Sequence, residues 1–233
     1  MRGQSFDGYR PSIAPAGQCG CPIPHAVAEI AFPKGSHLFH QGDHARGGFS
    51  LTSGLVAQER VNEDGDMVIL KLLQPGAFFP CADLFTDGLH TTGARALTDV
   101  SVCFIPTDRL IASMADPAIR AIILRRGGEE ARESESIIFR LCAADLGERI
   151  MAVLQQLAAS EPCNDHGRQV LNLPLSWRDV AAMVGTSPEV LSRTLRKLAE
   201  NGRIAFAGRR VTLLHQPPRE GRTTAMSRNC MGR

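Results

Sequence analysis

The chain has 233 residues, of which 43% are hydrophobic, and its formal net charge is +2. This length allows one large domain or two modest ones, and the apolar content excludes a chain that is disordered throughout. Because the net charge is small, any surface for nucleic acid must be a local basic patch. No apolar run approaches the roughly 20 residues of a membrane helix, and the N-terminal segment lacks the apolar core of a secretory signal. We therefore expect a cytoplasmic protein with no membrane partner.

The chain contains seven cysteines, an odd number at irregular spacing. In a chain expected in the cytoplasm, this pattern argues against a disulfide framework. Metal binding, redox chemistry and simple burial all remain open for these residues. Cys142 lies in an apolar stretch with helical spacing, and we expect it to pack as a small hydrophobic side chain.

The first half of the chain has the pattern of an all-β domain behind an arm. Residues 1–24 contain Gly, Pro and Ser without periodicity, which predicts a flexible N-terminal arm. Over 25–108, short apolar runs alternate with turn residues about every 8–12 residues, which is typical of a sandwich or barrel. Residues 54–61 and 67–73, separated by Asn-Glu-Asp-Gly-Asp, predict a hairpin.

The hydrophobic period changes after Pro106, and we expect helices from there. A long helix is predicted within 109–143, with Pro117 in its first turn. Its Gly127-Gly128 pair costs about 1 kcal/mol per glycine relative to alanine, so the helix needs support from packing, for example against a second copy of the chain, unless it bends there. The predicted interface residues of this dimerisation helix are Ile119, Ile122 and Ile138.

The segment 144–215 contains the signals of two capped helices and a hairpin, after a helix predicted from Asp145 to Ala159. Ser176 followed by Asp179 predicts a capping box, and Gly185 ends that short helix. Ser187 and Pro188 begin the next helix. Two short helices around a tight turn predict a helix-turn-helix, and the hairpin over 204–214 would be its wing. Residues 216–233 are polar and basic, and we expect a disordered tail.

The second of these helices carries side chains suited to reading DNA bases. Glu189, Ser192 and Arg193 are spaced i, i+3 and i+4, so they share one face near the helix N-terminus. A carboxylate accepts from cytosine N4, and a guanidinium donates to guanine O6 and N7. The alternative is an ordinary exposed ion pair between Glu189 and Arg193, but the helix-turn-helix layout around them favours DNA. The predicted DNA-backbone contacts are Ser176, Thr186, Ser187, Arg196, Lys197, Arg209 and Arg210.

The segment from Leu175 to Leu195 resembles the Crp/Fnr family of bacterial transcription regulators. The Glu-x-x-Ser-Arg spacing is similar to the Fnr branch, which reads half-sites beginning TTGA; the Crp branch has an arginine where this chain has Pro188. The resemblance implies an α+β fold with an N-terminal β-roll (a cupin-like jelly roll), a long dimerisation helix and a C-terminal winged helix-turn-helix. It also implies a homodimer that binds double-stranded DNA and RNA polymerase and has no catalytic residues.

The β-roll of this family often holds a ligand, but the cyclic-nucleotide motif is absent here. Residues 78–92 lack both the Gly-Glu-Leu turn and the Arg-Ser pair that bind the phosphate, and Arg95 stands at a different place in the motif. A phosphate in such a pocket needs a cationic partner. The sequence therefore argues against cAMP.

An iron–sulfur cluster is the cofactor that the resemblance favours. Residues 94–106 are similar to the Fnr segment around its distal ligand, so Cys103 takes that role, with Cys19 and Cys21 as N-terminal ligands. The chain departs from Fnr in having two N-terminal cysteines in place of three. Because four thiolates are usual, the fourth ligand would be Cys81 or a residue other than cysteine. The expected signal is oxygen, redox state or nitric oxide.

Haem is the alternative cofactor. Cys81 lies close to where the carbon-monoxide-sensing branch of the family places its haem cysteine, and Cys21-Pro22 resembles the dipeptide of haem-responsive proteins. A thiol redox switch, another ligand or no ligand also remain open. A different class, an enzyme on a small β-barrel, is disfavoured because the sequence lacks the common catalytic motifs. Asp83, Asp87 and His90 could imitate a catalytic cluster, but they lie in a turn-rich stretch where acidic residues are expected.

Overall fold

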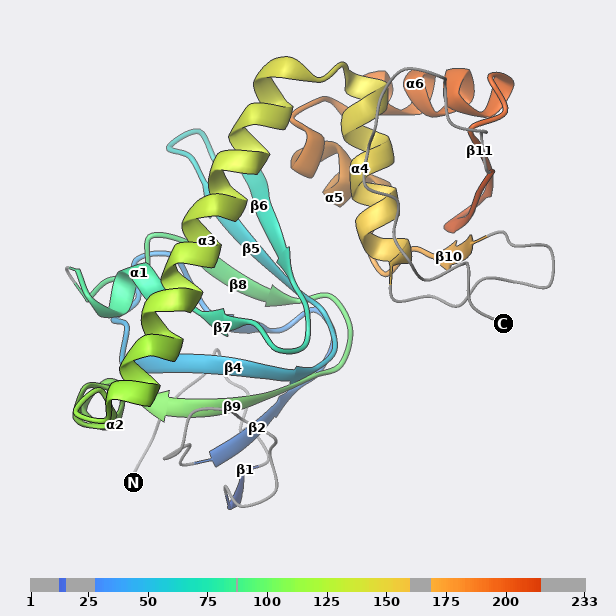
Figure 1. Ribbon diagram of the computed structural model, residues 1–233. Coiled ribbons are helices and arrows are strands. Elements are labelled where there is room, and N and C mark those ends of the chain that lie inside the picture. The colour runs from blue at the N-terminus through green and yellow to red at the C-terminus, as the bar shows by residue number, and fades with distance from the viewer. Residues whose placement is uncertain (1–12, 16–27, 87, 160–168, 215–233) are drawn as a thin grey trace, which may run out of the picture. The chain divides into compact units, whose positions relative to one another are not determined.

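The computed structural model describes residues 13–15, 28–86, 88–159 and 169–214 (Figure 1). The chain divides into two compact units, Met1–Ile137 and Ile138–Arg233. The long helix α3 (Pro117–Ala143) runs across this boundary and lies within the segment 109–143, where the sequence predicts a long helix. Among the described residues, none of the helices combines the length and apolarity required to cross a membrane.

The first unit contains two antiparallel sheets, which confirms the predicted β-roll. One sheet has the order β1-β2-β9-β4-β7 and the other the order β3-β8-β5-β6. Aromatic and aliphatic side chains from both sheets, Phe49 and Val56 among them, form one buried core. The strands are β1 (Ile13–Pro15), β2 (Ala28–Phe32), β3 (His37–Phe39), β4 (Gly47–Ser53), β5 (Val56–Val61), β6 (Met67–Leu73), β7 (Phe78–Phe79), β8 (Gly93–Ala96) and β9 (Val100–Pro106).

The predicted hairpin over 54–73 is present as β5 and β6, which pair from Val56 opposite Leu73 to Val61 opposite Met67. Strand β1 was not predicted. It pairs with β2 at Ile13 opposite Ile30, inside the segment for which the sequence predicts an arm. Because a three-residue strand has little pattern of its own, its pairing with β2 is what defines it.

Among the described residues of the first unit, the helices are α1 (Cys81–Leu84), α2 (Thr107–Ser113) and the greater part of α3. Ile119 and Ile123 of α3 are buried in a cluster with Ile105 of β9 and Leu110 of α2. This burial corrects the prediction that Ile119 lies in a dimer interface, because its side chain already packs in the core of its own chain. Ile122 is half-buried and Ile138 is 61% exposed.

The second unit contains the predicted helix-turn-helix. Helix α4 (Leu146–Ala158) precedes α5 (Trp177–Val184) and α6 (Pro188–Glu200). The wing strands β11 (Ile204–Ala207) and β12 (Arg210–Leu213) form an antiparallel hairpin as predicted. The sequence did not predict β10 (Gln169–Asn172), which pairs along β12 and makes the wing a three-stranded sheet.

Candidate nucleic-acid interface

Helix α6 has one buried side and one exposed side. Leu191, Leu195 and Leu198 are buried in the second unit. Glu189, Ser192 and Arg193, the predicted base-reading residues, are exposed on a shared face. Arg196 and Lys197 are also exposed, one turn further along the helix. The face predicted to enter the major groove is therefore accessible. The three leucines on the opposite side pack α6 into the core of the second unit.

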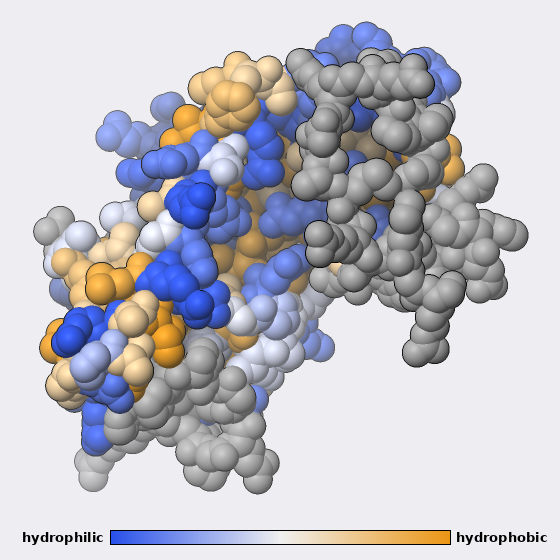
Figure 2. Space-filling model, in the orientation of Figure 1, coloured by the Kyte–Doolittle hydropathy of each residue, from blue (hydrophilic) through white to orange (hydrophobic). Residues whose placement is uncertain are grey.

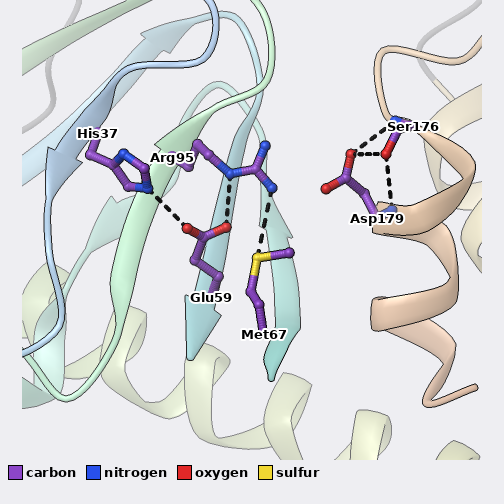
Figure 3. Close-up of polar contacts among 6 residues, drawn as sticks. All are labelled: His37, Glu59, Met67, Arg95, Ser176 and Asp179. Atoms are coloured by element: carbon purple, nitrogen blue, oxygen red, sulfur yellow. Dashed lines mark hydrogen bonds and ion pairs between the residues drawn. The ribbon is translucent and has the colours of Figure 1, made fainter. Parts of the chain in front are cut away.

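The start of α5 is fixed by the predicted capping box. The Ser176 hydroxyl accepts a 3.1 Å hydrogen bond from the backbone N–H of Asp179, and the Asp179 carboxylate accepts a 2.9 Å bond from the backbone N–H of Ser176 (Figure 3). The same hydroxyl donates to the Asp179 carboxylate at 2.6 Å. The Ser176 hydroxyl therefore donates its proton within the helix cap. To donate to a DNA phosphate, as the sequence predicts, it would have to give up the bond to Asp179.

The turn between α5 and α6 depends on Gly185 and Ser187. Gly185 adopts φ +65°, a left-handed conformation that costs glycine little. The Ser187 hydroxyl then accepts a hydrogen bond from the backbone N–H of Val190, and Pro188 occupies the first turn of α6. These caps confirm the predicted helix boundaries. Thr186 is half-buried in the turn, and Ser187 is exposed.

Glu189 is an anion at the start of the exposed face. Its own backbone N–H and the Ser187 hydroxyl hydrogen-bond to the carboxylate and, together with the charge of Arg193, lower the pKa of Glu189. The N-terminus of a helix also favours negative charge. The face therefore presents a carboxylate acceptor and a guanidinium donor one helical turn apart, which is the chemistry needed to accept from cytosine and donate to guanine.

The wing adds exposed cations beside this helix. Arg209 and Arg210, both predicted to contact the DNA backbone, are exposed at the turn between β11 and β12. Cationic side chains at such positions contribute affinity that does not depend on the base sequence.

Comparison with known proteins identifies this arrangement. Residues 29–116 match the family model of the cyclic nucleotide-binding domain, and residues 148–218 match that of the Crp-like helix-turn-helix domain. The chain is a member of the Crp/Fnr family. As a Crp/Fnr protein with this helix-turn-helix, it is a DNA-binding transcription regulator.

Relatives with assigned roles cover most of the chain. The transcriptional activator protein FnrA of Stutzerimonas stutzeri is 28% identical over 182 residues, which are 78% of this chain and 74% of that protein. The CRP-like cAMP-activated global transcriptional regulator of Mycobacterium tuberculosis is 26% identical over 209 residues, 89% of this chain and 91% of that protein. The structure of FixK2 from Bradyrhizobium japonicum has the same fold, with a TM-score of 0.69 at 23% identity, and the match covers 81% of this chain and 92% of that one.

Two cations in the β-roll of this Crp/Fnr regulator are already paired. Arg95 of β8 donates a 2.9 Å hydrogen bond to Glu59 of β5, which also bonds to His37 at 3.0 Å (Figure 3). Burial opposes ionisation of Glu59, but the bonds from His37 and Arg95 outweigh it and lower its pKa. Lys71 of β6 donates a 2.6 Å bond to Glu130 of α3. Arg95 and Lys71 thus both have carboxylate partners within the chain.

The predicted metal ligands fall into two groups. Cys19 and Cys21 lie outside the described residues. Cys103 on β9 is fully buried and is disulfide-bonded, and neither Cys81 nor Cys142 is its partner. Within the described ranges, no three His, Cys, Asp or Glu side chains come together in a group that could hold a metal ion.

Cys81 lies at the start of α1, in the apolar cluster that packs against α3. Its thiol donates to the carbonyl oxygen of Phe78 at 3.7 Å. Burial and the nearby carboxylate of Glu130 raise the pKa of Cys81 to about 12. The Cys81 side chain is therefore a buried, protonated thiol in the chain by itself. Cys142 is a free, exposed cysteine in a single copy of the chain. The prediction that it packs as a buried side chain is therefore wrong for the single chain.

The structure also explains the acidic residues that could have imitated a catalytic cluster. Asp83 and His90 are both buried; the Asp83 carboxylate is hydrogen-bonded to Nδ1 of His90 at 3.2 Å and accepts from the Thr91 hydroxyl at 2.9 Å. The ring of His90 stacks on Phe39 with centroids 3.8 Å apart. Asp87 lies outside the described residues. The Asp83–His90 pair therefore fastens α1 to the following loop.

Proposed function

We propose that this regulator binds, as a homodimer, palindromic DNA with half-sites beginning TTGA, and that oxygen, redox state or nitric oxide controls the binding through Cys103. The exposed set of Glu189, Ser192 and Arg193 on α6 is the observation that carries the base-reading part. Within the Crp/Fnr family, Glu, Ser and Arg at this spacing resemble the Fnr branch, which reads half-sites beginning TTGA. RNA polymerase is the expected partner on the bound DNA.

The dimer is supported by a stripe of exposed residues on α3. Leu124, Ala131 and Ile138 recur every seven residues, and Leu124 and Ile138 are 66% and 61% exposed. Three positions further along, a second set has the same seven-residue spacing and completes the stripe: Gly127, Ser134 and Leu141. Apolar and small residues at such spacing form the contact seam of paired parallel helices. The space-filling view shows apolar surface at the C-terminal end of α3 (Figure 2).

Of the two glycines of α3, Gly127 belongs to this stripe and Gly128 is next to it. A Cβ atom built at Gly127 or Gly128 would meet nothing within 4 Å. Nothing within the described part of the chain therefore requires glycine there, although each glycine costs about 1 kcal/mol in a helix. A second helix that approaches closely would account for small residues at these positions. Two copies joined along α3 would also match the two-fold symmetry of a palindrome.

The redox response is supported by the sheet around Cys103. Cys103 of β9 lies opposite Glu29 of β2, and Glu29 lies opposite Ala14 of β1. Because neighbouring strands are about 4.8 Å apart, the backbones of Ala14 and Cys103 are about 10 Å apart. Cys19 and Cys21 follow β1 within the next six residues. At about 3.5 Å per residue, this length of chain permits either sulfur to reach Cys103.

Two chemistries would use these sulfurs. In a thiol–disulfide switch, two thiols lose two protons and two electrons to an oxidant such as oxygen, and an S–S bond forms between them. An iron–sulfur cluster would need four ligands, and Cys19, Cys21 and Cys103 supply three. Among the described residues no three candidate ligands come together, so a cluster at Cys103 would need Cys19 and Cys21 together with a fourth ligand.

The test is a gel shift on the palindrome TTGAT-N4-ATCAA, with protein purified without oxygen and then exposed to it. We expect binding that depends on the TTGA half-sites and changes on exposure to oxygen. Iron and sulfide analysis, an absorption spectrum and a free-thiol count on the same samples separate the chemistries. A Cys103→Ser variant should lose the response and keep the binding site preference. Binding with no preference for the palindrome would contradict the base-reading part, and an unchanged response in Cys103→Ser would contradict the redox part.

A further inference from the structure

The only tryptophan of the chain, Trp177, contacts the turn of the wing. It is the first residue of α5, and its indole N–H donates a 2.9 Å hydrogen bond to the carbonyl oxygen of Gly208. Its ring meets that of Phe206 edge-on, with centroids 6.0 Å apart and an interplanar angle of 68°. Gly208 lies in the turn between β11 and β12, directly before Arg209 and Arg210.

A second hydrogen bond holds the next peptide of the same turn. The backbone N–H of Leu173 donates to the carbonyl oxygen of Arg209 at 2.8 Å. Two consecutive carbonyl groups of the wing turn are thus bound, one to the first residue of α5 and one to the segment before it. Gly208 adopts φ +59°, so the turn takes a left-handed step that most residues resist. The direction in which the Arg209 side chain leaves the turn is therefore set by contacts outside the hairpin.

The helix cap does not need Trp177. The capping box of α5 is formed by Ser176 and Asp179 alone. Trp177 is half-buried, and an indole at the start of a short helix could point its N–H to water. Its N–H points to the wing turn, and its ring contacts Phe206 on the same hairpin. We infer that Trp177 is a positioning residue that fixes the wing so that Arg209 and Arg210 meet the DNA backbone.

This inference rests on the proposed DNA binding and adds a residue that neither the capping pattern nor the recognition helix assigns. An untethered hairpin would place its arginines in many orientations, and ordering them on the DNA would cost conformational entropy. Loss of the tether should therefore weaken binding to all sequences alike. It should also lower the salt dependence of binding, because fewer phosphates would be neutralised.

The experiment is a double-mutant cycle on DNA affinity, measured by fluorescence anisotropy of a labelled palindrome at several salt concentrations. Trp177→Phe keeps a ring against Phe206 and removes the N–H donor. We expect it to weaken binding by about 5- to 10-fold, the worth of one hydrogen bond, and to lower the salt slope by about one phosphate contact. Arg209→Ala should cost clearly less in the Trp177→Phe background than in the parent, because its contact would already be weakened.

Arg193→Ala in both backgrounds is the control, since Arg193 lies on α6 and not in the wing turn. Its cost should be the same with and without Trp177. Additive effects of Trp177→Phe and Arg209→Ala would overturn the inference. If Trp177→Phe fails to fold, Phe206→Leu replaces it in the cycle, and additivity there has the same meaning. A parent protein that does not bind the palindrome at all would instead contradict the proposed function.

Discussion

The guanidinium of Arg149 donates a 2.8 Å hydrogen bond to the carbonyl oxygen of Val184. Arg149 lies on α4, and Val184 is the last residue of α5, directly before Gly185 turns the chain toward α6. A cation at the C-terminus of a helix also interacts favourably with the helix dipole. This contact binds α4 to the turn on which the orientation of the recognition helix depends.

Replacement of Arg149 should therefore loosen the helix-turn-helix. We expect Arg149→Met to lower the free energy of unfolding by about 1–3 kcal/mol, because a charged donor is lost and a buried carbonyl is left without its partner. Urea unfolding followed by circular dichroism measures the change. Arg178→Met is the matched control, since Arg178 is exposed on α5. Equal stability of the two variants would show that the Arg149–Val184 bond contributes nothing.

The α3 stripe predicts the effect of a charge at its exposed end. Ile138→Glu should shift the protein from dimer to monomer in sedimentation velocity, because two carboxylates would face each other across the seam. Phe139→Glu is the control: Phe139 is 71% exposed on the same helix but lies outside the stripe. Dimers in Ile138→Glu, or monomers in Phe139→Glu, would place the contact surface elsewhere.

The environments of two cysteines predict opposite reactivities. Cys81 is buried with a pKa raised to about 12, whereas Cys142 is exposed. Because the thiolate is the reactive form, iodoacetamide should alkylate Cys142 and leave Cys81 unmodified in the native protein. Mass spectrometry of the alkylated, digested protein gives both rates, and urea-unfolded protein gives the reference rate for Cys81. Modification of native Cys81 at the rate seen in urea would contradict the buried-thiol assignment.

The buried pair of His90 and Asp83 predicts a dependence of stability on pH. Burial lowers the pKa of His90, although the charges of Asp83 and Asp43 oppose the shift. The unfolded chain then binds a proton more tightly than the folded one, so stability is retained above the unfolded pKa of about 6.5 and is lost as the pH falls toward the folded pKa. Urea unfolding at about pH 7.5 and about pH 5.5 should show this loss in the parent. A His90→Gln variant should lose less unfolding free energy than the parent over this pH range. An equal loss in the parent and the variant would mean that other titrating groups cause it.

The parts of the fold that could be predicted are those with local signals. The capping residues Ser176 and Ser187, with Gly185 between them, define α5 and α6 by local interactions alone. The shared face of Glu189 and Arg193 followed from helical spacing alone.

The parts that were missed depend on partners distant in the sequence. β1 and β10 are too short to have a pattern, and each is defined by the strand it pairs with. Ile119 was assigned to a partner chain because helical periodicity shows which face is apolar but not what covers it. The contact of Trp177 with Gly208 joins residues 31 positions apart, which no local pattern indicates.

The central claim is that α6 reads bases through Glu189, Ser192 and Arg193, and Arg193 tests it most directly. Affinities of the parent and of Arg193→Ala are measured on the TTGAT-N4-ATCAA palindrome and on a duplex with the guanine of each half-site replaced. The parent should prefer the palindrome by about 1–3 kcal/mol for each replaced base pair, and Arg193→Ala should bind both duplexes with nearly the same affinity. A variant that keeps the parent's full preference for the guanine would show that Arg193 does not read it and that the recognition face is assigned wrongly.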